Sequence, residues 1–332
     1  MPSKLVGLTQ HVRNRIIRSV VLVVVTLILM AVSGELILRL KHANQKNYTI
    51  EMWRYAKELK QVVPDEPALG HVHIPGSSAT LQNIDMQINS LGMRGPEPSQ
   101  AASKTVLLLG SSITLGWGVS EAKTLRSRLD EKLGGDVQVL NGGVGNYNVT
   151  RSLHLYEKKW RAKTKPDLIV VHFFVNDAEY LPPSQQNIII RNSQLAVTLY
   201  YIFQNYFGDS GGLESLVKHY KQVYSPDARG YQEMKVSLKK LDDIAKQDGA
   251  RVVLTMIPDI HQLESYPFTF IHQNMRALAD ENGWAYLDFL PSLKGYKGPE
   301  LWTIQGDPHP NGIVHNIMAE ELAKFIELNG LL

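Results

Sequence analysis

Four short segments of this 332-residue sequence carry reactive polar side chains, three of them beside glycine or proline, although they lie far apart along the chain. They are Gly110-Ser111-Ser112, Asn141-Gly142-Gly143, Asn176-Asp177 and Asp307-Pro308-His309. Nucleophilic acyl transfer needs a hydroxyl, an imidazole base and a carboxylate that orients it, together with N–H donors for the oxyanion that forms. The residue types therefore suggest Ser112 as nucleophile, His309 as base and Asp307 as orienting acid. The backbone N–H groups of Ser112 and Gly143 and the side chain of Asn176 are the candidate oxyanion donors.

Each segment alone is an ordinary turn, so its meaning depends on the elements that position it. Short apolar runs at residues 105–109, 137–140, 168–174, 251–257 and 285–289 alternate with helical patterns. This alternation predicts an α/β fold, a three-layer α/β/α sandwich around a five-stranded, mostly parallel sheet. In such sheets ligands bind at the carboxyl ends of the strands, which is where all four segments fall.

Three helices are predicted from apolar residues that recur every three or four positions. The first has Ser120 as its predicted N-cap. Their apolar faces are formed by Ala122, Leu125, Leu129 and Leu133, then by Tyr231, Met234, Leu238, Leu241 and Ala245, and finally by Val314, Met318, Leu322 and Phe325.

In order and strand context, the four segments resemble the sequence blocks of the SGNH or GDSL hydrolases, named for their Ser, Gly, Asn and His residues. The resemblance covers residues 85–330, and the stretch Asn89 to Gly95 is similar to the lead-in of bacterial membrane-linked members. It implies a serine esterase with no metal or organic cofactor, in which Ser112, Gly143, Asn176, His309 and Asp307 have the roles given above. The substrate would be a small-molecule, carbohydrate or lipid ester.

The sequence departs from the family pattern at three positions. Ser111 replaces the usual aspartate before the nucleophile, Phe174 replaces a glycine, and Asp307 lies two residues before His309 where three is common. Ser111 and His315 therefore remain rivals for the nucleophile and the base. Two other functions remain open: an O-acyltransferase that modifies an exported polysaccharide, and a noncatalytic binding module on the same fold.

The N-terminal region contains an apolar run from Val20 to Val32 that continues to Leu40, which is long enough for a membrane-spanning helix. Lys4, Arg13, Arg15 and Arg18 precede it. Because positively charged flanks stay in the cytoplasm, we expect residues 1–18 inside, an anchor at 19–40 and the catalytic domain in the periplasm. A cleaved signal peptide ending near Ala31-Val32-Ser33 and a buried helix of a soluble protein are the alternatives.

Composition narrows the remaining questions. The net charge is +3 without a basic block, so nucleic acid is not an expected partner, and with no cysteine the chain has no disulfides or thiolate metal sites. Turn residues predict a linker at 41–100 with a short strand or hairpin at 86–94, followed by a hydrolase domain at 101–332. An insertion at 184–229 contains a predicted helix at 195–207. We expect this helix to pack on the core; the alternatives are that it forms an apolar lid or contacts lipid. Protein partners are not predicted.

Overall fold

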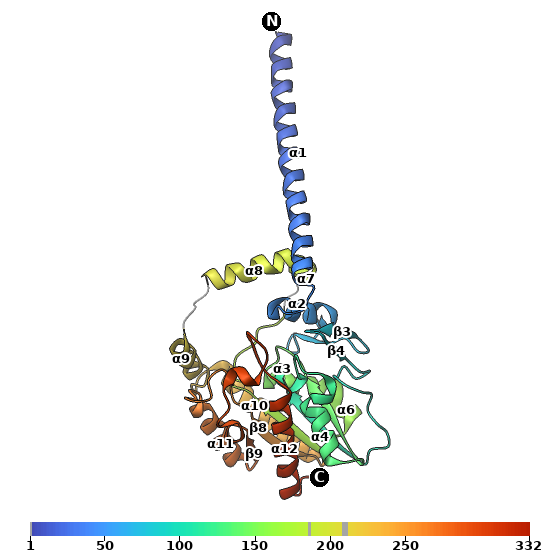
Figure 1. Ribbon diagram of the computed structural model, residues 1–332, viewed down its shortest axis with the longest axis vertical. Helices are drawn as coiled ribbons and strands as arrows, with labels where there is room; N and C mark the ends of the chain where they lie inside the picture. Colours follow the sequence, from blue (N-terminus) through green and yellow to red (C-terminus); the bar gives the residue numbers. More distant parts are fainter. Residues whose placement is uncertain (1, 185–186, 208–211) are drawn as a thin grey trace. The chain divides into compact units, whose positions relative to one another are not determined.

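The computed structural model describes the chain except residues 1, 185–186 and 208–211, and its centre is a five-stranded parallel sheet (Figure 1). The spatial order is β6-β5-β7-β8-β9, and every neighbouring pair is parallel. The strands are β5 (Lys104–Gly110), β6 (Val137–Gly143), β7 (Leu168–Phe173), β8 (Arg251–Met256) and β9 (Ala285–Asp288). All five predicted strands are confirmed, with ends that differ by no more than three residues.

Helices cover both faces of the sheet because its buried strands are apolar on both sides. Leu107 and Leu109 of β5 pack in a cluster that includes residues of α5 (Val149–Leu155), α10 (Arg229–Asp248) and α11 (Thr269–Asn282). Val106 and Leu108, which point the opposite way, pack with α4 (Leu125–Leu133) and α12 (Gly312–Leu328). The predicted α/β/α sandwich is therefore confirmed. One detail was wrong: Thr124 caps α4 by accepting from Ser127 N–H, and Ser120 precedes a short 3-10 turn instead.

The stretch from residue 41 to 100 is more ordered than the predicted linker. It holds α2 (Tyr48–Glu58), an antiparallel pair of β1 (Lys60–Val62) with β2 (His71–His73), and a hairpin of β3 (Ser78–Leu81) with β4 (Ile84–Gln87). The hairpin of β3 and β4 thus lies at 78–87, and within the predicted segment 86–94 the chain turns back so that Ile88 and Arg94 form an isolated antiparallel bridge. Turn residues marked the ends of these elements, but strands of three or four residues are too short to give an alternating pattern.

Other short elements complete the chain. They are α3 (Ser112–Leu115), the π-helical turn at Tyr156–Trp160, α6 (Arg161–Thr164), α7 (Ile188–Asn192), α8 (Gln194–Phe207), α9 (Leu213–Val223), 3-10 turns at Glu121–Lys123, Pro291–Leu293 and Gly298–Leu301, and the hairpin of β10 (Trp302–Ile304) with β11 (Asp307–Pro310).

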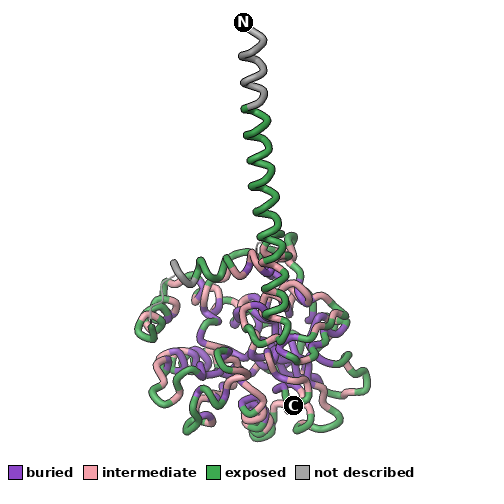
Figure 2. The backbone as a smooth tube through the Cα atoms, turned by 45° about the horizontal axis from the view of Figure 1, so that its top comes forward, coloured by how far each residue is buried: buried purple, intermediate pink, exposed green. Residues whose placement is uncertain are grey.

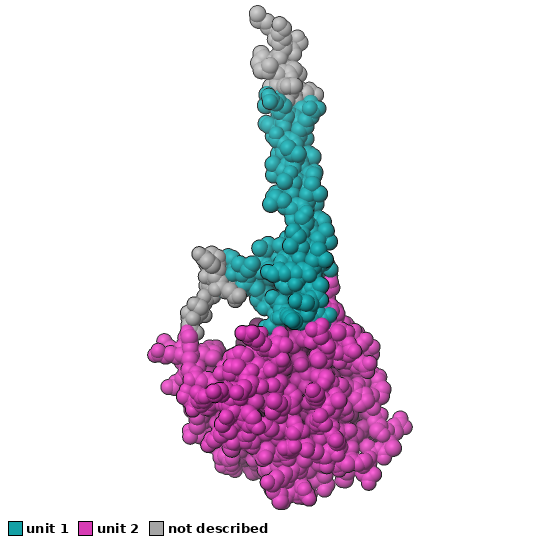
Figure 3. All heavy atoms as spheres, viewed as in Figure 1, with its two compact units in different colours: residues 1–50, 187–209 teal, residues 51–186, 210–332 magenta. Residues whose placement is uncertain are grey.

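The chain divides into two compact units, coloured separately in Figure 3. One consists of residues 51–186 and 210–332 and contains the sheet with the helices that cover it. The other consists of residues 1–50 and 187–209, and its longest element is α1 (Pro2–Lys41). Val12–Lys41 is long and apolar enough to cross a membrane and is exposed along most of its length, drawn green in Figure 2, whereas Gly34, Glu35 and Leu38 are partly buried.

Candidate active site

Ser112 follows β5, which lies between β6 and β7 in the sheet, and is the first residue of α3. The sharp turn from strand to helix needs glycine at position 110, since a Cβ there would lie 2.1 Å from Thr114 Oγ1. The Ser112 hydroxyl is partly exposed and lies 2.8 Å from His309 Nε2. Ser111 is buried. The geometry therefore favours Ser112 over Ser111 as the nucleophile.

His309 and Asp307 lie together on β11, at the same edge of the sheet as Ser112. His309 Nδ1 is 2.6 Å from Asp307 Oδ1, and the backbone N–H of His309 donates to the same oxygen at 3.2 Å. The two-residue spacing, which departs from the family pattern, is thus compatible with an oriented imidazole. Serine, histidine and aspartate form one continuous hydrogen-bonded relay.

Asp307 is fully buried, and two donors bind its other carboxylate oxygen. Gln82 Nε2 lies 2.7 Å and Trp117 Nε1 2.9 Å from Asp307 Oδ2. Burial by itself would raise the pKa of Asp307, but the hydrogen bonds from His309 and Gln82 outweigh it and hold this pKa below its usual value. The carboxylate therefore stays charged beside His309. Sequence reasoning missed both donors.

His315, the rival base, lies inside the protein and away from this relay. Its ring is completely buried in α12, and its Nδ1 accepts a hydrogen bond from the backbone N–H of Leu125 at 3.0 Å. Burial lowers the pKa of His315 to about 3, which keeps the ring neutral. These contacts argue against a role for His315 as the base.

The predicted oxyanion donors are not equally available. Asn176 is exposed in the loop after β7, the strand beside β5. Gly143 is buried within β6, and its N–H donates to Asn141 Oδ1 at 3.0 Å. A Cβ on Gly143 would lie 2.1 Å from the backbone nitrogen of Leu115, so this glycine allows α3 to approach the sheet. The assignment of Gly143 as an oxyanion donor therefore conflicts with the structure, because its N–H is occupied.

Asn146 is an exposed residue in the loop that follows β6. It has a positive φ of 65°, a conformation that asparagine tolerates better than most residues. Elements before the sheet support the loop from the other side: Tyr55 Oη accepts from the Gly145 N–H at 2.9 Å, and Lys60 Nζ donates to the Gly145 carbonyl at 3.1 Å.

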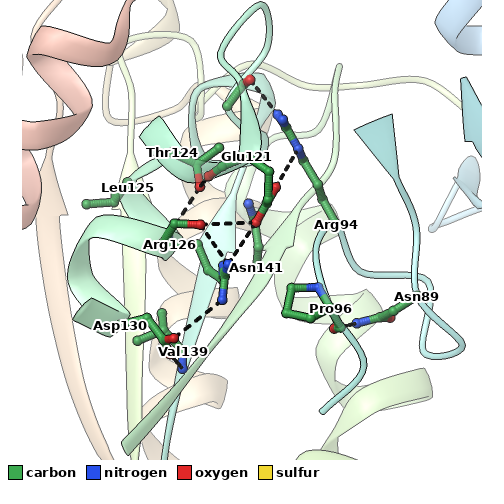
Figure 4. Close-up of polar contacts among 12 residues, drawn as sticks. Asn89, Arg94, Pro96, Glu121, Thr124, Leu125, Arg126, Asp130, Val139 and Asn141 are labelled. Carbon is green, nitrogen blue, oxygen red and sulfur yellow. Dashed lines mark hydrogen bonds and ion pairs between the residues drawn. The ribbon is translucent and has the colours of Figure 1, made fainter. Parts of the chain in front are cut away.

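Arg94 contacts the end of α3 and the turn that follows it, and Figure 4 shows its ion pair with Glu121. Its guanidinium donates to the carbonyl oxygens of Leu115 at 3.0 Å, Gly116 at 2.6 Å and Val119 at 2.6 Å. It also forms an ion pair of 3.1 Å with Glu121. The lead-in segment noted in the sequence therefore has a structural role, since its arginine fixes the turn that follows the nucleophile.

Among the side chains that the structure describes, no group of three or more His, Cys, Asp or Glu residues could hold a metal ion. The arrangement that remains is a serine, a histidine and an aspartate in hydrogen-bonding contact at the carboxyl edge of an α/β sheet. The chain belongs to the GDSL-like lipase/acylhydrolase family, whose model matches residues 108–317. It is accordingly an enzyme that acts on ester bonds.

Solved structures similar to this chain include three of low sequence identity. TesA is 19% identical, with 69% of this chain and 100% of that chain covered and a TM-score of 0.45. A catalytic mutant of Axe2, an acetylxylan esterase from Geobacillus stearothermophilus, is 18% identical, with 68% of this chain and 95% of that chain covered and a TM-score of 0.44. A family two carbohydrate esterase from Clostridium thermocellum is 11% identical, with 72% and 68% covered and a TM-score of 0.44. No curated protein matches the sequence.

Proposed function

We propose that this protein is a serine acyl hydrolase in which Ser112 forms a covalent acyl-enzyme. The relay from Ser112 Oγ through His309 to Asp307, with contacts of 2.8 and 2.6 Å, is the observation that carries the proposal. His309 Nε2 takes the hydroxyl proton as Ser112 attacks the acyl carbonyl, and it returns a proton to the leaving alcohol. Asp307 holds the ring and stabilises its charged form. Water then releases the acyl group by the same route.

The oxyanion would be bound by the backbone N–H of Ser112 and the side-chain amide of Asn176. In place of Gly143, whose N–H is occupied, we assign the third donor to the backbone N–H of Asn146. This residue follows β6, the other strand beside β5, so its loop and that of Asn176 flank Ser112. Each such donor typically contributes about 100- to 1,000-fold to turnover.

The proposed location is the outer face of a membrane. α1 is the anchor, and the basic residues Arg13, Arg15 and Arg18 before the apolar run keep the N-terminus in the cytoplasm. Protease added to intact spheroplasts should digest the catalytic unit while leaving a cytoplasmic marker uncut. Mass spectrometry of the membrane-extracted protein separates a retained anchor from a cleaved signal peptide, since cleavage would remove about the first 33 residues.

A fluorescent organophosphonate tests the serine chemistry directly. The wild type and Ser111→Ala should be labelled, whereas Ser112→Ala should not, and peptide mapping should place the adduct on Ser112. Ser111→Ala is the matched control because it removes a neighbouring hydroxyl from the same turn. A wild type that resists the probe would contradict the proposal and favour a noncatalytic binding module.

Turnover assays then define the ester that is cleaved. We propose carbohydrate or lipid esters as substrates, and a series of nitrophenyl esters of increasing acyl length separates the two. Preference for acetyl groups supports a carbohydrate ester, and preference for long chains supports a lipid. Adding an oligosaccharide acceptor tests the alternative of O-acyl transfer, in which acylated sugar replaces free acid as the main product.

A further inference from the structure

Glu35 is an acidic residue near the end of an otherwise apolar helix, and the structure provides it with a complete set of partners. Its carboxylate accepts from Ser193 Oγ at 2.9 Å, from the Gln194 N–H at 3.0 Å and from the Leu195 N–H at 2.8 Å. Arg39 donates to it from the next turn of α1 at 2.8 Å. The two amides belong to the first turn of α8, whose N–H groups have no partners within the helix. Glu35 therefore caps α8 from a different helix.

The cap fixes where α8 starts and which way it runs. Leu195 packs beside Gly34, where an added Cβ would lie 3.5 Å from its Cδ2. From this contact α8 extends across the end of α1 and not alongside it, as Figure 1 shows. Both helices belong to the same compact unit. A helix that leaves the end of a spanning helix in this way runs along the plane of the membrane.

The surface of α8 is apolar to a degree that is unusual in water. Leu199, Tyr200, Ile202 and Phe203 are 56%, 45%, 57% and 60% exposed, and no charged residue occurs between Gln194 and Phe207. Soluble proteins rarely expose a continuous patch of this kind without a partner. With 14 residues the helix is about 21 Å long, too short to cross a bilayer.

We propose that α8 lies in the headgroup region of the bilayer that α1 spans, with its apolar side chains in lipid. The proposal rests on the spanning role proposed for α1. Lipid is the occupant favoured by two observations: the patch begins at the end of the candidate span, and it carries tyrosines and a phenylalanine suited to the interface. Ile188 and Ile189 of α7, which precede the cap, are exposed as well and would extend the lipid contact.

The absence of cysteine makes the test direct, because a single introduced cysteine can carry a fluorophore. The full-length protein is reconstituted in phosphatidylcholine vesicles whose lipids carry a spin-label quencher either just below the headgroup or deep in the acyl chain. At Phe203→Cys we expect stronger quenching by the shallow label than by the deep one. Leu27→Cys, in the middle of the apolar run, should show the reverse. Val236→Cys, an exposed apolar position on α10, should not be quenched.

The results separate this proposal from the one on which it rests. Quenching at Leu27→Cys without quenching at Phe203→Cys would leave the span intact and overturn the interfacial placement of α8. Loss of quenching at both positions would overturn the span itself. A label at Phe203→Cys that responds to acylation of Ser112 but not to lipid would identify α8 as an active-site lid and refute the proposal.

A second pair of variants tests the cap. Glu35→Leu removes the acceptor for all three contacts from the start of α8, so shallow quenching at Phe203→Cys should fall by a factor of about two as the helix is released. Arg39→Leu removes the ion pair alone and should leave the quenching unchanged. Equal quenching in Glu35→Leu and wild type would refute the role assigned to this carboxylate.

Discussion

Replacement of Gln82 by leucine would remove a donor to the catalytic carboxylate while leaving the rest of the relay in place. The side chain comes from the turn of the β3–β4 hairpin, and its Nε2 is 2.7 Å from Asp307 Oδ2. Its Oε1 is buried and has no hydrogen-bond partner among the described residues, so replacement by leucine removes only the side-chain hydrogen bond to Asp307. We expect Gln82→Leu to weaken the charged form of Asp307.

The size of the effect follows from the chemistry of the contact. Hydrogen bonds to charged groups contribute about 1.5–3 kcal/mol, and about 1.4 kcal/mol corresponds to one pKa unit. The Gln82 bond is one of those that lower the pKa of Asp307, so its loss should raise that pKa by about 1–2 units. Because only the charged form of Asp307 stabilises the imidazole for proton transfer, the acid limb of kcat/KM should move to higher pH.

The assay is the pH profile of kcat/KM with a chromogenic acetyl ester. Trp117→Phe removes the second donor to the same oxygen and should shift the limb in the same direction. Gln87→Leu, an exposed substitution on the same hairpin, is the control and should match the wild type. A uniform loss of activity with an unmoved acid limb in Gln82→Leu would refute the reasoning, because it would show damage to the fold alone.

Three other changes have expected outcomes. Asn176→Ala should lower kcat about 100- to 1,000-fold with little change in KM in steady-state assays, and an unchanged kcat would exclude it from the oxyanion site. His315→Gln keeps an acceptor for the Leu125 N–H. Because burial lowers the pKa of His315 to about 3, the wild type loses stability as pH falls below 6.5. In urea unfolding, the free energy of unfolding of the variant should therefore fall less steeply with decreasing pH, by about 1.4 kcal/mol per pH unit. Burial raises the pKa of Asp177 to about 8, so between pH 3.8 and 8 its carboxyl group is ionised in the unfolded chain but protonated in the folded one, and the wild type loses stability as pH rises. Asp177→Asn should gain stability over the wild type in that window. An equal difference in unfolding free energy between the two proteins at pH 5 and pH 8, measured with urea, would contradict this.

The sheet and the relay could be predicted from sequence because each depends on local signals. Runs of buried apolar residues marked the five strands, and parallel strands bring their carboxyl ends to one edge. Ser112, His309 and Asp307 each lie at such an edge, and the structure places them in hydrogen-bonding contact. Their chemical roles remain a prediction until the variants are measured.

The parts that sequence did not reveal depend on contacts between distant segments. Gln82 is an ordinary turn residue until the fold brings it to Asp307, and nothing local distinguishes it from Gln87 on the same hairpin. Gly143 shows the same dependence: a glycine indicates close approach or an open N–H, and only the position of Asn141 shows that this N–H already has a partner. Glu35 likewise gained an explanation only from the start of α8.

The long reach of the Gln82 contact also sets when the protein can become active. Gln82 and Asp307 are 225 positions apart, and Ser112 and His309 are 197 apart. At usual rates of synthesis, roughly 10–45 s separate the appearance of the hairpin from that of the carboxylate it binds. During that interval the serine has neither base nor acid. We therefore expect the newborn chain to be unreactive at Ser112 until residues 307–309 have left the ribosome.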